Sequence, residues 1–161
     1  APVEDRTLRA GLYNLSLNNH REDIIRAFLE GIALNTRWLL QPVQKFMGRI
    51  VQEINMVGGG AQSNVWCQIF ADICNATIGL PSGTEFGAKG SALLAAYAAG
   101  IFDSLKDAAD AFCEVERVYE PIAKNVEIYA DIYELYKTIP FALSSAWEAR
   151  TKFLKKHGFQ G

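Results

Sequence analysis

The sequence lacks long apolar runs and is poor in histidine and cysteine, and each shortage excludes a class of protein. Its longest unbroken apolar stretches are far shorter than the roughly 18 residues that cross a bilayer. Charged residues stand where a signal peptide would have its apolar core. The two histidines form no pair, and the three cysteines lack the spacing of metal ligands or of a redox pair. We therefore expect a cytoplasmic protein with no membrane segment and no metal site built from its own side chains.

An excess of charge of one sign is also absent. The net charge is −2, and basic and acidic residues are interspersed, without the basic stripe that indicates nucleic acid binding. Half of the 161 residues are hydrophobic, which is enough for the core of one domain of ordinary size. We expect a single domain over residues 1–161 without a nucleic acid partner, and we expect Cys67, Cys74 and Cys113 to be small buried apolar side chains.

Two common nucleotide-binding motifs are missing as well. The dinucleotide motif G-x-G-x-x-G would need glycine or alanine where Ser63 stands. It would also need an acidic residue about 20 positions further on, where the chain has Ile78. The Walker loop needs lysine followed directly by serine or threonine, but Gly90 separates Lys89 from Ser91. The sequence therefore supports neither of these two folds.

What the sequence does contain is a glycine turn between a strand and a helix. A strand-like run over residues 51–57 leads into Gly58, Gly59 and Gly60, and a helix expected from Gln62 follows. Glycine lets the chain turn tightly and lets a ligand approach the main chain. The start of a helix adds unpaired N–H groups and a positive dipole end. The pattern indicates a binding site for an anion or a nucleotide. The alternative is a compact turn that binds nothing.

Helical spacing and proline positions predict the elements before this turn. Asn19 is the expected N-cap of a long helix with an apolar face. Pro42 should end or kink this helix, because proline lacks an N–H group, and Gly48 should close its last turn. A strand is expected over residues 50–57. The apolar residues that share the helix face are Ile24, Ile25, Phe28, Leu29 and Ile32.

The chain after the turn is expected to be mainly helical. The helix after the turn should bury Trp66, Ile69, Phe70 and Ile73 on one face. A short strand over residues 76–78 should follow it. Small residues indicate a tightly packed helix that begins near Gly87 and is capped by Gly100. The remaining expected elements are helices over 104–114 and 122–138, a break at Pro140, and a last helix containing Leu143, Trp147 and Leu154.

Two charged positions have structural interpretations. Arg26 and Glu30 are four residues apart, so they can form an ion pair on one helix face, which contributes little if it is exposed. Asp72 lies almost three turns from the start of its predicted helix. A structural hydrogen bond is therefore the better interpretation of this carboxylate than a catalytic base.

A longer pattern extends the glycine turn and resembles a known family. Gly58-Gly59-Gly60-Ala61-x-Ser63-x-x-Trp66-x-Gln68-x-x-Ala71-Asp72, followed by Glu85-x-Gly87-Ala88-x-Gly90-Ser91-Ala92, resembles the C-terminal half of the FGGY carbohydrate kinases. The similarity runs from about Gly11 to Tyr136. Within the family, the xylulose and L-xylulose kinase branch is the most similar.

The resemblance implies a fold and a function. The fold would be α/β and helix-rich, a partial ribonuclease-H-like lobe of the actin and hexokinase type. The chain would be the ATP-binding half of a kinase that transfers the γ-phosphoryl group of ATP to a ketose or polyol hydroxyl. Mg²⁺ would be held mainly by the nucleotide and by parts outside this chain. The implied binding residues are Gly58, Gly59, Gly60, Ala61, Ser63 and Asn64, with Asn64 near the adenine edge.

The resemblance also implies what this chain would lack. In the family, the catalytic aspartate and the sugar-binding lobe lie upstream of the matched stretch, so no catalytic residue is assigned here. Because the chain starts at Ala1 without methionine, we expect a piece of a kinase that is inactive alone and meets its sugar through the missing lobe. The expected parts are an irregular start over 1–19, a nucleotide-binding core over 20–100 and a helical tail over 101–161.

Two other functions stay open at this point. The chain could be a lobe of another actin-like ATPase, such as a polymerising or chaperone protein, or a non-catalytic dimerisation module. A missing upstream part would leave a strand edge and apolar helix faces uncovered, and both promote association. We therefore expect a homo-oligomer.

Overall fold

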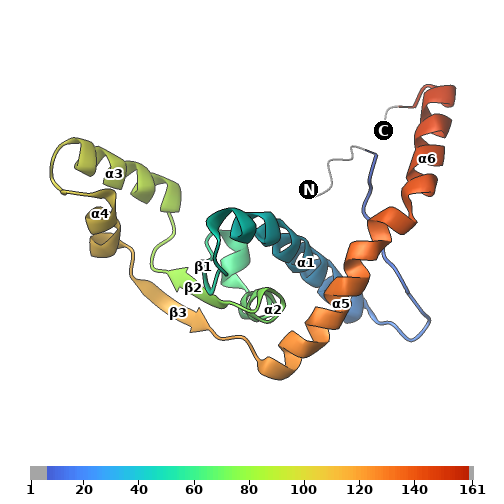
Figure 1. The fold of residues 1–161 in the computed structure, drawn as a ribbon, viewed down its shortest axis with the longest axis horizontal. Helices are drawn as coiled ribbons and strands as arrows, with labels where there is room; N and C mark the ends of the chain where they lie inside the picture. The colour runs from blue at the N-terminus through green and yellow to red at the C-terminus, as the bar shows by residue number, and fades with distance from the viewer. Residues whose placement is uncertain (1–6, 160–161) are drawn as a thin grey trace. The chain divides into compact units, whose positions relative to one another are not determined.

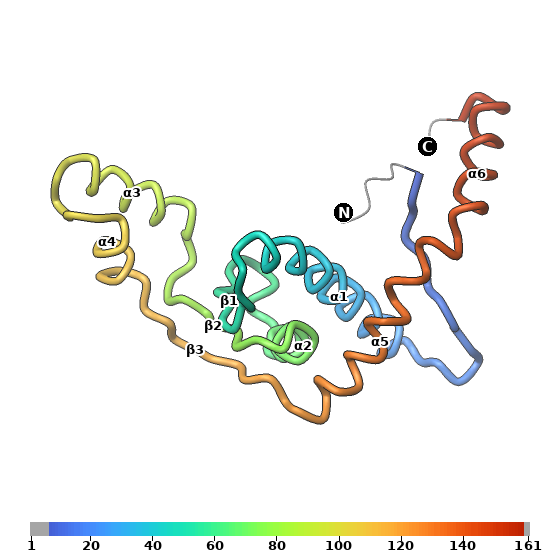
Figure 2. Tube along the Cα trace, viewed as in Figure 1, coloured from blue at the N-terminus to red at the C-terminus, as the bar shows by residue number. Residues whose placement is uncertain are grey.

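The computed structural model describes residues 7–159 and confirms a helix-rich α/β chain (Figure 1). Its contacts divide it into two compact units, one formed by the residues up to 49 together with those from 123 onward, and one by residues 50–122. Figure 2 traces the chain as it leaves the first unit after α1 and returns to it with α5. The elements in order are α1 (Arg21–Met47), β1 (Glu53–Asn55), η1 (Gly59–Gln62), α2 (Asn64–Cys74), β2 (Thr77–Pro81), α3 (Phe86–Ala98), α4 (Leu105–Phe112), β3 (Val115–Tyr119), α5 (Ala123–Ala142) and α6 (Ser144–His157).

The second unit is built on a mixed sheet of three strands in the order β1-β2-β3. β1 runs parallel to β2, with Ile54 opposite Ile78, and β2 runs antiparallel to β3, with Gly79 opposite Val118. β1 is shorter than the predicted strand, and β2 is longer than predicted. β3 was not predicted from the sequence; it pairs with β2 on the edge opposite β1.

Helix α2 covers this sheet and makes the core of the second unit. Cys67 and Ala71 of the helix pack with Ile78 and Leu80 of β2, and all four are buried. Partly buried side chains that surround them include Met56 before the turn. The prediction for the cysteines is confirmed only for Cys67, because Cys74 is partly buried and Cys113 is exposed.

Helix α1 of the first unit begins one residue later than predicted. His20, not Asn19, is the N-cap, and the His20 backbone N–H donates to Asp23 Oδ2 at 2.9 Å. Asn19 Oδ1 instead accepts from the backbone N–H of Ser16 at 2.7 Å. Pro42 lies inside the helix, so it does not end it. The helix ends at Met47, and Gly48 closes it as expected, with a left-handed φ of 65°.

Helix α5 carries the buried tyrosines of the first unit. Tyr129 and Tyr133 are both buried. The Arg37 guanidinium of α1 lies 4.4 Å from the ring centre of Tyr133. Pro140 was predicted to break the helix, but α5 continues to Ala142. α6 begins two residues after α5 ends.

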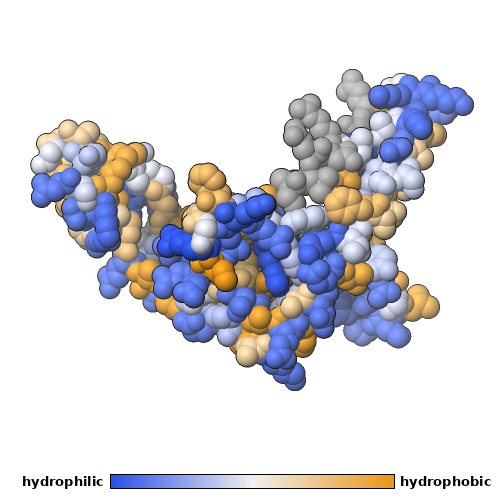
Figure 3. All heavy atoms as spheres, viewed as in Figure 1, coloured by the Kyte–Doolittle hydropathy of each residue, from blue (hydrophilic) through white to orange (hydrophobic). Residues whose placement is uncertain are grey.

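Helix α3 is largely uncovered. Within the described part of the chain, none of its residues is buried, although its sequence is rich in alanine and leucine. Leu94 and Tyr97 are exposed, as are Ile101 and Leu105 after it. Figure 3 shows apolar surface over α3 and α4. No described helix is long and apolar enough to cross a membrane.

Candidate functional site: the glycine turn

The glycine turn joins the end of the β1 segment to α2, all within the second unit. Gly58 has φ 90° and ψ −169°, a conformation that an L side chain rarely adopts, so glycine is required at this position. The next residues form the short 3₁₀ helix η1, in which the Ala61 N–H donates to the Gly58 carbonyl at 3.1 Å. The turn is therefore a wound, hydrogen-bonded structure, where the sequence predicted only a bend before a helix.

The second and third glycines of the turn have different surroundings. A Cβ atom built on Gly59 would meet nothing within 4 Å. A Cβ atom on Gly60 would lie 2.9 Å from Cζ3 of Trp66 and 3.0 Å from Cε of Met56. Gly60 is thus needed for close packing inside the unit, whereas Gly59 presents bare main chain to the exterior.

Ser63 starts helix α2. Its side-chain Oγ accepts the backbone N–H of Trp66 at 3.3 Å, and its carbonyl accepts the N–H of Cys67 at 3.0 Å. Serine is favoured at this position because its hydroxyl satisfies a donor that the helix leaves unpaired. The helix begins at Asn64 and not at Gln62, since the chain is 3₁₀-wound before it. The Ser63 hydroxyl has a structural role that the glycine pattern alone did not indicate.

Asn64, in the first turn of α2, is held by two residues of β3. Its Oδ1 accepts from the Tyr119 hydroxyl at 2.8 Å and from Arg117 Nη1 at 3.2 Å. Sequence reasoning missed both partners because it missed β3. The β-branched and aromatic residues Val115, Val118 and Tyr119 are a strand signal that could have indicated them.

Carboxylates are absent from the glycine turn itself. Among residues 7–159, no group of three or more histidine, cysteine, aspartate or glutamate residues could hold a metal ion. Buried Asp72 on α2 accepts hydrogen bonds from the Ile122 backbone N–H at 2.8 Å and from Gln68 Nε2 at 2.9 Å. This confirms the structural interpretation of Asp72. The described side chains therefore do not fit a Mg²⁺ site of their own.

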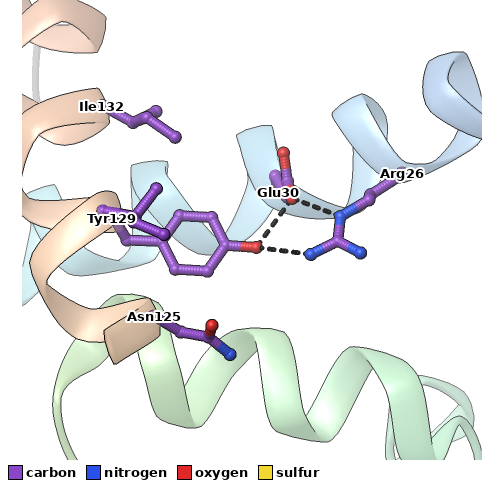
Figure 4. A pocket seen from close by; sticks show the side chains of 6 residues that line it. Arg26, Glu30, Asn125, Tyr129 and Ile132 are labelled. Carbon is purple, nitrogen blue, oxygen red and sulfur yellow. Dashed lines mark hydrogen bonds and ion pairs between the residues drawn. The ribbon is translucent and has the colours of Figure 1, made fainter. Parts of the chain in front are cut away.

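A separate pocket lies in the first unit and contains the predicted ion pair (Figure 4). Arg26 Nε lies 2.7 Å from Glu30 Oε1, and the Tyr129 hydroxyl donates to the same oxygen at 2.7 Å. Arg26 Nη2 also donates to the Tyr129 oxygen at 3.1 Å. Burial first, and then the hydrogen bond to Glu30, raise the pKa of Tyr129. The pair is thus one part of a three-residue contact between α1 and α5.

Comparisons with known proteins identify the fold. The chain superimposes on a ligand-bound xylulose kinase from Lactobacillus acidophilus with a TM-score of 0.83 and 27% identity, over 92% of this chain and 30% of that chain. It also superimposes on a Plasmodium falciparum glycerol kinase with ADP, with a TM-score of 0.68 and 25% identity, over 80% of this chain and 26% of that chain. The chain thus has part of the actin and hexokinase-like ATPase fold, as expected.

The sequence comparisons identify the family. Residues 1–99 match the FGGY family of carbohydrate kinases, C-terminal domain. The chain is also 32% identical to a xylulose kinase of Bacillus subtilis over 140 residues, which cover 86% of this chain and 28% of the relative. The chain belongs to the FGGY family, and it spans about 28% of the length of this relative. Family membership decides against the alternative of a polymerising or chaperone ATPase.

Proposed function

We propose that this chain is the ATP-binding part of a carbohydrate kinase that transfers the γ-phosphoryl group of ATP to a sugar hydroxyl, with xylulose or a related ketose as the substrate. Membership in the FGGY family and the names of its relatives support the reaction class. The sugar would bind to polypeptide outside this chain. A cytoplasmic location without nucleic acid partners fits this function.

The observation that carries the proposal is the open main chain at Gly58 and Gly59. Both residues are exposed, and a Cβ atom built on either one would meet nothing within 4 Å. A flat nucleoside can lie against such a surface because no Cβ atom intervenes. The N-terminal turn of α2 follows directly and favours negative charge. The similarity to a glycerol kinase with ADP supports a nucleotide as the occupant.

The residues of the turn would bind and orient the nucleotide and would not perform the chemistry. Gly58, Gly59, Gly60 and Ala61 would supply main chain, Ser63 would fix the start of α2, and Asn64 would contact the base. Mg²⁺ would arrive with the nucleotide phosphates, since the turn offers no carboxylate. Phosphoryl transfer depends on positioning both reactants in line and on neutralising the developing charge. We therefore propose that the isolated chain binds nucleotide without turning over sugar.

Thermal stability in the presence of ADP tests this proposal. A ligand that binds only the folded state must raise the melting temperature with concentration. Gly59→Ala and Gly59→Val add a small and a larger side chain to the open surface, so they should reduce the ADP-dependent shift in steps while leaving the ligand-free melting temperature nearly unchanged. Gly31→Ala in α1, which also meets nothing within 4 Å, is the matched control and should keep the full shift.

Two outcomes would count against the proposal. An unchanged melting temperature at millimolar ADP would leave the turn without a ligand. An undiminished shift in Gly59→Val would place the nucleotide elsewhere. A coupled assay with ATP, Mg²⁺ and a set of ketoses should show no turnover by the isolated chain, and measurable turnover would contradict the assignment of the catalytic base to polypeptide outside it.

A homo-oligomer is a second proposal for the same chain. It is supported by the exposed apolar residues of α3 and the segment after it, including Leu94, Tyr97 and Ile101. Contiguous exposed apolar surface of this kind promotes association. A non-catalytic dimerisation module would use this surface without any ligand at the glycine turn, so the ADP experiment distinguishes the two functions.

A further inference from the structure

The polarity of the Asn64 amide group is fixed by its neighbours. Arg117 can only donate hydrogen bonds, so the Asn64 atom 3.2 Å from its Nη1 must be the amide oxygen. The Tyr119 hydroxyl reaches the same oxygen at 2.8 Å. The two donors occupy both lone pairs of a carbonyl oxygen, which accepts at most two strong hydrogen bonds.

The remaining hydrogen-bonding capacity of Asn64 is the NH₂ group. Among the described residues, Nδ2 of Asn64 has no hydrogen-bond partner, whereas Oδ1 has two. Asn64 stands in the first turn of α2, immediately after the glycine turn, and is exposed. The Asn64 side chain therefore offers a base two N–H donors and no free acceptor.

We infer that Arg117 and Tyr119 are positioning residues that make Asn64 a donor toward the nucleobase, and that the site therefore recognises a ring acceptor and not the adenine 6-amino group. This inference rests on the proposed nucleotide-binding function. An asparagine that is free to turn can pair with adenine through both N7 and the 6-amino group, and that pairing excludes bases with a 6-oxo group. An asparagine locked as a donor loses this discrimination, because N7 is a hydrogen-bond acceptor in both adenine and hypoxanthine.

The expected consequence is a purine site that tolerates a 6-oxo group. ADP and IDP differ at the 6 position, where the amino donor of adenine is replaced by an acceptor. Their dissociation constants for the unmodified chain, measured by calorimetric titration with equal Mg²⁺, should agree within about threefold. That limit lies below the loss of about 1.4 kcal/mol, or tenfold, that one unsatisfied hydrogen bond causes.

Two variants separate positioning from a merely structural role. Arg117→Leu combined with Tyr119→Phe removes both donors and keeps the Tyr119 ring, which packs against the core of the second unit. The freed amide can then turn its oxygen to the base, so the preference for ADP over IDP should rise at least threefold. Asn64→Ala should weaken both nucleotides by the same factor, because it removes one donor that both use. Arg21→Leu, an exposed arginine of α1, is the control and should leave the ratio unchanged.

Each result decides for or against the inference. A preference for ADP above threefold in the unmodified chain, an unchanged ratio in the double variant, or unaffected affinities in Asn64→Ala would overturn it. These results differ from failure of the proposed function, in which neither ADP nor IDP binds the unmodified chain. Circular dichroism on the double variant establishes that it is folded, and Arg117→Leu alone provides a milder second variant if it is not.

Discussion

The Ile122 backbone N–H donates to Oδ1 of Asp72 at 2.8 Å, although the two residues lie 50 positions apart in the chain. Asp72 is 2% exposed, and the same oxygen accepts from Gln68 Nε2 at 2.9 Å. Gln68 Nε2 also donates to the carbonyl of Glu120 at 2.9 Å. The helix that begins at the glycine turn is thereby tied to the segment that follows β3.

Asp72→Ala should destabilise the chain by about 1–3 kcal/mol, because the Ile122 N–H and the Gln68 amide would lose a buried acceptor. Asp72→Asn keeps an acceptor oxygen and should cost less. Urea denaturation, followed by circular dichroism, measures both effects. Asp103→Ala, an exposed carboxylate, serves as the control, and equal stability of the Asp72→Ala and Asp103→Ala variants would contradict the structural role of Asp72.

The same substitution to alanine should have different effects on stability at two adjacent glycines of the turn. Gly60→Ala places a methyl group 2.9 Å from the Trp66 ring, so it should lower the free energy of unfolding by about 1–3 kcal/mol through overpacking. Gly59→Ala meets nothing within 4 Å and should be nearly neutral. Thermal melts of the two variants check the difference, and a neutral Gly60→Ala variant would contradict the packing of Trp66 against the turn.

Stability should fall in alkaline solution, with a contribution from Tyr129. Burial and the hydrogen bond to Glu30 raise its pKa above the ordinary value of 10.0. The folded chain therefore holds this proton to a higher pH than the unfolded chain does. The stabilisation is complete below about pH 10 and is lost as pH rises through the folded-state pKa. Tyr129→Phe should make the alkaline decline shallower.

Urea midpoints between pH 8 and pH 11 measure this effect. Tyr129→Phe should already be less stable at pH 8, by about 1 kcal/mol, because the hydrogen bonds to Glu30 and Arg26 are lost. The exposed Tyr13→Phe variant is the control and should follow the unmodified chain. An identical alkaline slope in Tyr129→Phe and Tyr13→Phe would show that the Tyr129 proton is not linked to folding.

Local signals in the sequence predicted the helices and one cap well. Gly48 closes α1 as expected, because glycine adopts the left-handed conformation without steric cost from a Cβ atom. Pro140 was predicted to break its helix and does not, and Pro42 does not end its helix. Pro42 lies inside α1, which continues to Met47, and Pro140 lies inside α5, which continues to Ala142. Tertiary contacts can outweigh the local cost of proline, and a single sequence does not display those contacts.

The structure around the glycine turn was predicted only in part, for a related reason. The glycine pattern gave the place of the turn, since Gly58 needs its positive φ whatever surrounds it. The hydrogen bond from Arg117 to Asn64 was not predicted, because the pairing of β3 with β2 brings Arg117 to it from a distant part of the chain. Strand pairing of this kind depends on tertiary contacts more than on local sequence.

The chain should self-associate at micromolar concentration through its uncovered apolar helix. Leu94 of α3 is 58% exposed, and no described residue of that helix is buried. Leu94→Glu should shift the chain toward the monomer, because it places a charge on the apolar surface. Ala92→Glu adds the same charge to another face of the same helix, at an exposed position, and is the matched control. Light scattering checks the prediction, and a clean monomer of the unmodified chain would contradict it.

The central claim is that a nucleotide binds on the main chain of residues 58–61 next to the start of α2. Amide resonances of the ¹⁵N-labelled chain, recorded during titration with Mg-ADP, test it most directly. The account predicts that the largest shift changes fall on Gly58, Gly59, Gly60, Ala61 and Asn64, and that Gly59→Val reduces them. Shift changes confined to other parts of the chain, or none at saturating ADP, would contradict it.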